Sequence, residues 1–212
     1  CASRFAIWRA QSDLAATLAA ANEKHLIFHG RGGSLARGGG RIDALVQTAP
    51  ASAINGVLRL TEQGEAINQS YGLSPIALRT LDRAFSALSL ATSQAIRSPP
   101  QADNPKHIEL CARMVEVSRD TYRRLVFSDP TFFEYFETVT PIDVISRMQI
   151  GSRPASRPDK QGLDALRSVP WVFAWTQSRH MLPYWYGAGA GLDAAISSDG
   201  LAAVQTAYRE WG

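Results

Sequence analysis

The stretch "LIFHGRGGSLARGGGR", residues 26–41, combines a histidine and three arginines with a run of glycines. Arginine carries a planar, permanently charged fork that suits phosphate and carboxylate. Glycine-rich backbone can turn its N–H groups inward and form an anion-binding nest. Arg31 and Arg37 could therefore hold an anion, and His29, at the end of the apolar run, could move a proton near neutral pH.

Two other interpretations fit the local composition of this stretch. One is a disordered arginine-glycine segment that touches RNA, and the other is a structural loop beside a histidine whose hydrogen bonds are satisfied. RNA binding is disfavoured because there is one such block, no aromatic residue lies within residues 30–41, and ordered elements are expected on both sides. The anion site and the structural loop both remain open on local sequence.

A second cationic loop, "GSRPASR", carries Arg153 and Arg157, and Arg167 follows fourteen residues after Arg153. Proline restricts the backbone beside both loop arginines, so their side chains would leave a stiff scaffold, as an oriented anion grip requires. The alternatives are a solvated surface loop and, for Arg167, an ion pair with Asp164.

Other polar and aromatic groups favour structural roles over chemical ones. Glu62 and Glu65 could be metal ligands or acid/base groups, but such a pair more often occupies the first turn of a helix. His180 is expected inside an aromatic core built from a cluster of large side chains: Trp171, Phe173, Trp175, Tyr184, Trp185 and Tyr186.

Helices dominate the predicted elements, with two short strands near the first third of the chain. An apolar run before the glycines predicts a buried strand at 25–29, and alternation predicts a second strand within 56–65. The break "SPPQADNP" at 98–105 separates a part formed by residues 1–97 from a helical part formed by residues 105–212. Helical periods and caps predict these helices: 3–22, 41–48, 74–97, 105–126 and 199–210.

Composition limits the classes of function that the 212 residues can serve. The formal net charge of +3 is too small to indicate nucleic-acid binding, and no run of apolar residues is long enough for a membrane span. All cationic side chains except Lys24, Lys106 and Lys160 are arginine, a bias that favours geometrically defined anion sites. Two cysteines without metal-site spacing are consistent with a reducing compartment, so a cytoplasmic protein is expected.

Four phrases, in this order and at these separations, resemble the later part of phosphoenolpyruvate carboxylase. They are "FHGRGGSLARGGG", "LRLTEQGE", "GSRPASR" and "LRSVPWVFAWTQSRHMLPYWYGAG". The resemblance covers essentially the whole chain. It implies a mostly helical piece, with a few barrel strands, of a phosphoenolpyruvate/pyruvate-type (β/α)8 TIM barrel that carries extra helices, so residues 1–212 would be a single part of that catalytic region.

The resemblance also implies an activity, that of a carbon–carbon lyase. Phosphoenolpyruvate and bicarbonate would be joined to give oxaloacetate and phosphate through carboxyphosphate and the enolate of pyruvate. His29 would take the carboxyphosphate proton, Arg31 and Arg37 would hold phosphoryl and carboxylate oxygens, and Arg153 and Arg167 would complete the anion cage.

Several further expectations follow from the resemblance. Mg²⁺ or Mn²⁺ would be required, with no metal ligands in this chain, so the 212 residues should be inactive alone. The complete enzyme would be an allosteric homotetramer inhibited by aspartate or malate. A non-catalytic module that binds small anions or dicarboxylates is the alternative function.

Overall fold

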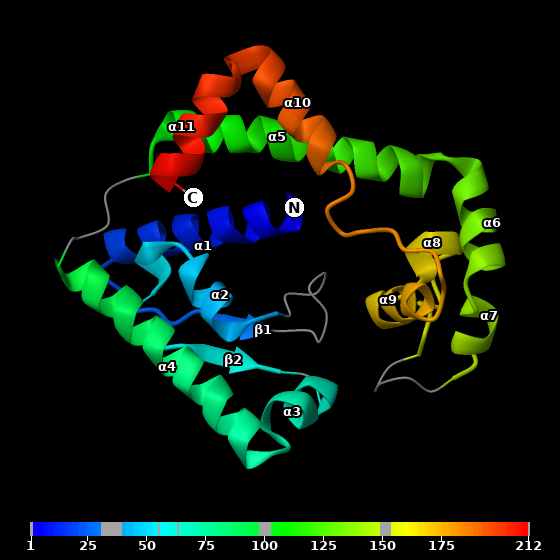
Figure 1. Ribbon diagram of the computed structural model, residues 1–212, viewed down its shortest axis with the longest axis horizontal. Helices are drawn as coiled ribbons and strands as arrows, with labels where there is room; N and C mark the ends of the chain where they lie inside the picture. The colour runs from blue at the N-terminus through cyan, green and yellow to red at the C-terminus, as the bar shows by residue number, and fades with distance from the viewer. Residues whose placement is uncertain are drawn as a thin grey trace. The chain divides into compact units, whose positions relative to one another are not determined.

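The computed structural model describes residues 2–30, 40–54, 56–62, 64–97, 103–148 and 154–211, leaving out the side chains of Ala51, Glu65 and Trp211. Over these ranges the chain is mostly helical and has few strands (Figure 1). It divides into two compact units, Ser3–Asn104 and Pro105–Gly212, the latter including Cys1–Ala2. Each unit is described by itself below. No helix in the described ranges is long and apolar enough to cross a membrane.

The first unit contains two strands connected through a helix. Its elements are α1 Ala2–Ala20, β1 Phe28–Gly30, α2 Ile42–Gln47, η2 Ala51–Ala53, β2 Arg59–Thr61, α3 Gly64–Tyr71 and α4 Ser74–Arg97. Strands β1 and β2 pair in parallel and lie side by side in Figure 1. Helix α4 packs against both α2 and α3. Because parallel strands require a crossover between them, α2 serves as the helix of a βαβ unit.

The register of the two strands sets where the following loops begin. His29 lies opposite Leu60, and Gly30, the last residue of β1, lies opposite Thr61, the last residue of β2. The chain segments after both strands therefore start from the same edge of the sheet. In α/β folds this carboxyl edge is where binding loops gather.

The prediction of a buried strand at 25–29 is wrong for β1, whose burial pattern is exposed, half-buried, exposed. Phe28 is 57% exposed, and only His29, at the centre of β1, is half-buried. Arg59 of β2 covers one face of the Phe28 ring, with its guanidinium carbon 5.3 Å from the ring centroid. The apolar run "HLIF" indicates a strand but does not specify which segments would cover its two faces.

The regular elements of the second unit are mostly helices, joined by loops and one short antiparallel bridge between Ser156 and Leu166. Its elements are α5 Pro105–Arg123, η3 Arg124–Ser128, α6 Pro130–Val139, α7 Ile142–Ile145, α8 Gly162–Ala165, α9 Ser168–Thr176, α10 Ala188–Asp199 and α11 Leu201–Trp211. Helix α6 begins with a side-chain cap: the Asp129 carboxylate accepts a hydrogen bond from the Thr131 N–H, and Pro130 occupies the first helical position. The hydrogen bond from the Thr131 hydroxyl to the Asp129 carboxylate, together with the bond from the Thr131 N–H, lowers the pKa of the Asp129 carboxyl.

Helix α10 lies close against α5 in this unit, as Figure 1 shows. Gly191 makes the close approach possible, since a Cβ atom there would lie 2.2 Å from the Met114 carbonyl oxygen of α5. The end of α11 is joined to α5 through His107, whose Nε2 lies 3.4 Å from a Glu210 carboxylate oxygen. A small core of Leu110, Ala195 and Ala207 fills the space among the three helices.

The main core of this unit is aromatic. Phe136 has no exposed surface, and its ring stacks on Trp171 at a centroid distance of 4.9 Å, with Trp175 at 5.3 Å. The prediction of an aromatic core is therefore confirmed for Trp171 and Trp175. The prediction is wrong for the loop that follows α9, because Trp185 is 53% exposed and Tyr184 is also exposed.

His180 also lies outside the core that the sequence suggested. The side chain is exposed, and its Nδ1 is 2.6 Å from the Tyr135 hydroxyl oxygen. Its backbone N–H donates to Ser178 Oγ, and Ser178 donates in turn to the Val139 carbonyl oxygen. These bonds anchor the start of the aromatic loop to the end of α6.

Candidate functional site

His29 is placed by the strand pairing of the first unit. It is the middle residue of β1, is half-buried, and is one residue from the carboxyl edge of the sheet. The adjacent strand holds the β1 backbone in an extended conformation, so the imidazole leaves a backbone fixed by a parallel ladder. A proton carrier needs such a fixed position relative to its substrate.

A pocket of about 450 Å³ opens beside His29. Its lining comes from α1, from β1 and from α2 with the residues that precede and follow it, and includes Arg4, Trp8, Gln11, His29 and Arg41. The volume is within the range of small-molecule sites. His29 therefore faces a space that could admit a small anionic substrate, with cationic side chains at the wall.

The α1 side of this pocket was missed by the sequence reasoning. Arg4, Trp8 and Gln11 lie four and three residues apart and share one face of α1, where they line the pocket. The signal was available in the spacing. This spacing does not by itself indicate a pocket, because the same period also predicts ordinary packing of an amphipathic helix.

Arg41 is in the backbone conformation that starts α2. Arg41 has φ −68° and ψ 138°, the extended backbone conformation of a residue that immediately precedes a helix. Its guanidinium pairs with the Asp43 carboxylate in the first turn of α2. The hydrogen bond from Arg41 lowers the pKa of the Asp43 carboxyl, which therefore stays ionised. Its negative charge interacts favourably with the positive N-terminal end of the α2 dipole.

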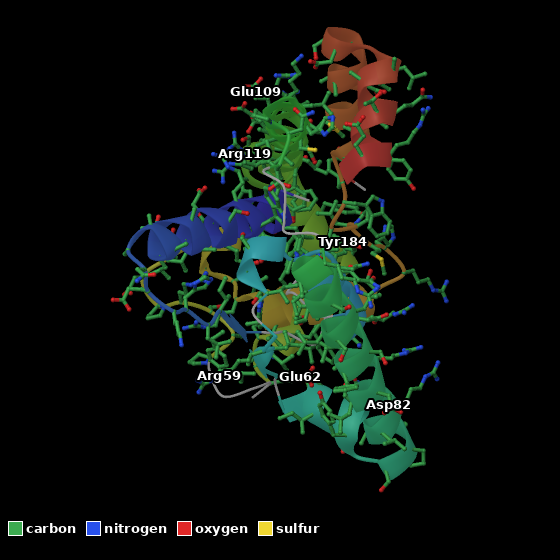
Figure 2. The ribbon with its side chains drawn as sticks, turned by 90° about the vertical axis from the view of Figure 1, so that its left-hand side faces the viewer. Arg59, Glu62, Asp82, Glu109, Arg119 and Tyr184 are labelled. Atoms are coloured by element: carbon green, nitrogen blue, oxygen red, sulfur yellow. The ribbon has the colours of Figure 1, made fainter. Side chains whose placement is uncertain are left out.

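Glu62 follows β2 at the same edge of the sheet. It is half-buried, and Figure 2 shows its side chain and that of Arg59 coming from this strand and its end. Among the described residues, no group of three or more His, Cys, Asp or Glu side chains could hold a metal ion. The backbone of Glu65 is in the first turn of α3, as the helix-start interpretation predicted. A metal or acid/base role for this pair stays a prediction.

Arg167 belongs to the second unit and immediately precedes α9. Its backbone N–H donates to the Ala155 carbonyl oxygen at 3.0 Å, and its carbonyl oxygen accepts from the Trp171 N–H. The Nε atom is buried and makes no hydrogen bond within the described ranges. The alternative of an ion pair between Arg167 and Asp164 is not observed among those residues.

The arginines Arg31, Arg37 and Arg153 lie outside the described residues. Of the five predicted site residues, the structure therefore places His29 in the first unit and Arg167 in the second. Arg157, which the sequence had grouped with Arg153 as a loop cation, donates to backbone carbonyl oxygens within the second unit.

Comparison with known proteins gives a match over the whole chain. The family model described as phosphoenolpyruvate carboxylase matches residues 1–212. The chain is 40% identical over 212 residues to phosphoenolpyruvate carboxylase 2 of Chlamydomonas reinhardtii, covering 99% of this chain and 17% of that protein. It is 42% identical over 209 residues to phosphoenolpyruvate carboxylase of Picea abies, covering 98% of this chain and 21% of that protein.

A bacterial relative is similar to the same degree. The phosphoenolpyruvate carboxylase of Xanthomonas oryzae is 40% identical over 214 residues, which cover 99% of this chain and 23% of that protein. The chain thus spans about a fifth of the length of the curated relatives it matches.

Proposed function

Because the chain belongs to the phosphoenolpyruvate carboxylase family, we propose that it forms part of an enzyme that joins phosphoenolpyruvate to bicarbonate. The products are oxaloacetate and phosphate, and the 212 residues alone are inactive. The match of the family model to all residues of the chain carries this proposal. The position of His29, near the carboxyl edge of a parallel strand pair and beside a pocket, supports it.

In the proposed reaction, bicarbonate oxygen attacks the phosphorus atom, and the bond to the enol oxygen breaks. Carboxyphosphate and the enolate of pyruvate result. His29 then removes the carboxyl proton of carboxyphosphate, which breaks down to CO₂ and phosphate. The enolate carbon attacks CO₂ and forms oxaloacetate. Arg31, Arg37, Arg153 and Arg167 stabilise the anionic groups, whose charge moves during these steps.

The same proposal includes the barrel and its metal. Strands β1 and β2 would be two strands of a (β/α)8 barrel, and their parallel pairing with a helix between them supports this. The proposal places the ligands of Mg²⁺ or Mn²⁺ outside this chain; among the described residues, no group of three His, Cys, Asp or Glu side chains could hold a metal ion. This donor set therefore does not fit a complete metal site.

A chimera tests the proposed function directly. In it, residues 1–212 replace the matched segment of the Xanthomonas oryzae relative, and oxaloacetate is measured with a coupled assay. We expect bicarbonate-dependent turnover by the chimera and none by the 212 residues alone. A folded chimera that binds phosphoenolpyruvate or malate without turnover would favour the non-catalytic binding module. Turnover by the 212 residues alone would contradict the proposed inactivity.

Replacing Arg37 with Ala in the chimera should weaken both turnover and inhibition. The proposal gives Arg37 a role in gripping the substrate anion and, in the homotetrameric enzyme, the inhibitory dicarboxylate. We expect a loss of roughly 1.5–3 kcal/mol of binding free energy for each ligand, the usual value of a charge-assisted bond. The KM for phosphoenolpyruvate and the half-inhibitory concentration of aspartate or malate measure the two effects. An unaltered inhibitor response would exclude Arg37 from the inhibitor site.

A further inference from the structure

Arg157 makes hydrogen bonds to three successive carbonyl groups. Its backbone N–H donates to the Ala165 oxygen at 2.8 Å. Its Nη1 atom donates to the Asp164 oxygen at 3.0 Å and to the Leu166 oxygen at 3.3 Å. One residue therefore contacts the entire backbone segment that leads into Arg167.

These carbonyl groups need a partner because of where α8 ends. Helix α8 has only four residues, Gly162–Ala165, and Leu166 follows it in an extended conformation. The last carbonyl groups of a helix have no partner within the helix. A guanidinium at this end satisfies them and also interacts favourably with the negative end of the helix dipole.

The other side of this segment is fixed as well. Ser156 and Leu166 form an antiparallel bridge, and the Arg167 N–H donates to the Ala155 oxygen at 3.0 Å. Leu163 and Leu166 pack against the aromatic core. The segments 155–157 and 164–167 thus form a small clamp that is anchored to the core and from which the Arg167 side chain extends.

The Arg167 side chain itself has few constraints of its own. Its buried Nε makes no hydrogen bond within the described part of the chain, and no side-chain bond caps α9 at this residue. The direction of the guanidinium therefore depends on how precisely the backbone at Arg167 is held.

We propose that Arg157 is a positioning residue that acts through Arg167. It holds the 164–166 carbonyl groups and so sets the backbone from which Arg167 reaches the substrate anion. The role of Arg167 in this inference rests on the proposed function above, whereas the clamp rests on the observed bonds. A displacement of about 1 Å at an anion-binding group can lower the rate by about 100-fold.

Four variants of the chimera separate this role from others: Arg157→Gln, Arg157→Lys, Arg167→Ala, and the double variant that combines Arg157→Gln with Arg167→Ala. Arg157→Gln should lower kcat/KM by roughly tenfold to a hundredfold. In the Arg167→Ala background the same change should lower kcat/KM by less than about twofold, because its effect passes through Arg167.

The Arg157→Lys variant tests whether one nitrogen donor is enough. Since Nη1 alone makes both side-chain bonds, a lysine nitrogen can replace it, and kcat/KM of Arg157→Lys should stay within about threefold of the parent. Arg209→Gln, an exposed arginine of α11, is the matched control.

Amide hydrogen exchange at Arg167 in the same chimera tests the clamp without reference to turnover. Exchange should accelerate in Arg157→Gln and stay slow in Arg157→Lys and Arg209→Gln. Unchanged exchange in Arg157→Gln, or a full multiplicative loss of kcat/KM in the double variant, would overturn the proposal. An inactive parent chimera would count against the proposed function, and the exchange result would still decide whether Arg157 positions Arg167.

Discussion

Asparagine in place of His29 is expected to abolish most oxaloacetate formation by the chimera. Asparagine is close in size to histidine and can still hydrogen bond, but it cannot accept a proton near neutral pH. If His29 is the base that deprotonates carboxyphosphate, its loss should lower the rate of carboxylation roughly 10²- to 10⁴-fold. Release of phosphate should fall less, because the attack of bicarbonate on phosphorus precedes the step that needs this base.

Parallel assays of oxaloacetate and phosphate on one sample measure this difference. His180→Asn is the matched control, since His180 is exposed and bonded to Tyr135 in the other unit. The control should retain both activities. Equal losses of both products in His29→Asn would indicate a role in binding, and unchanged oxaloacetate formation would remove His29 from the mechanism.

The elements around His29 were largely predictable from sequence, because their signals are local. Apolar periodicity indicated α1, a serine cap followed by proline indicated α4, and the change of period before the glycines indicated β1. The parallel pairing of β1 with β2 has no such local signal. The two strands are three residues long and lie about thirty residues apart, so their register depends on contacts that neither segment encodes by itself.

The surroundings of individual side chains were predicted less well. The loop "HMLPYWYG" is as rich in aromatic side chains as the segment that forms α9, yet Trp185 is exposed while Trp175 is buried. Hydrophobicity gives the tendency of a side chain to be buried, but the position of the covering helix decides the outcome. The same limit applies to His180, which was expected in the core and lies at the surface.

Arg157 shows how a structural role can be hidden in a chemically suggestive loop. Two prolines beside the loop arginines predicted a stiff scaffold for an anion grip, whereas the Arg157 side chain donates to backbone carbonyl groups of the same unit. Its partners are carbonyl groups seven to nine residues away, at the end of α8 and directly after it. A four-residue helix has no detectable period, and backbone acceptors carry no side-chain identity, so the sequence could not identify these bonds.

Truncation of Phe136 to Ala should destabilise the second unit more than any other change to its core. Phe136 is the only large side chain with no exposed surface among the described residues, and its ring packs against both Trp171 and Trp175. Loss of the ring leaves a cavity that two indole groups cannot fill without leaving their positions in α9. We expect the free energy of unfolding to fall by about 3–5 kcal/mol. Because α9 begins immediately after Arg167, anion binding should weaken together with stability.

Urea unfolding followed by tryptophan fluorescence measures this effect, since Trp171 and Trp175 contact the substituted ring. Phe127→Ala is the matched control, because that ring is 48% exposed and its main described partner is the Arg123 guanidinium. The control should cost about 1 kcal/mol or less. Equal losses in the two variants would mean that Phe136 does not hold the core together. The position of Arg167 would then depend on the clamp made by Arg157 rather than on the packing of α6 against α9.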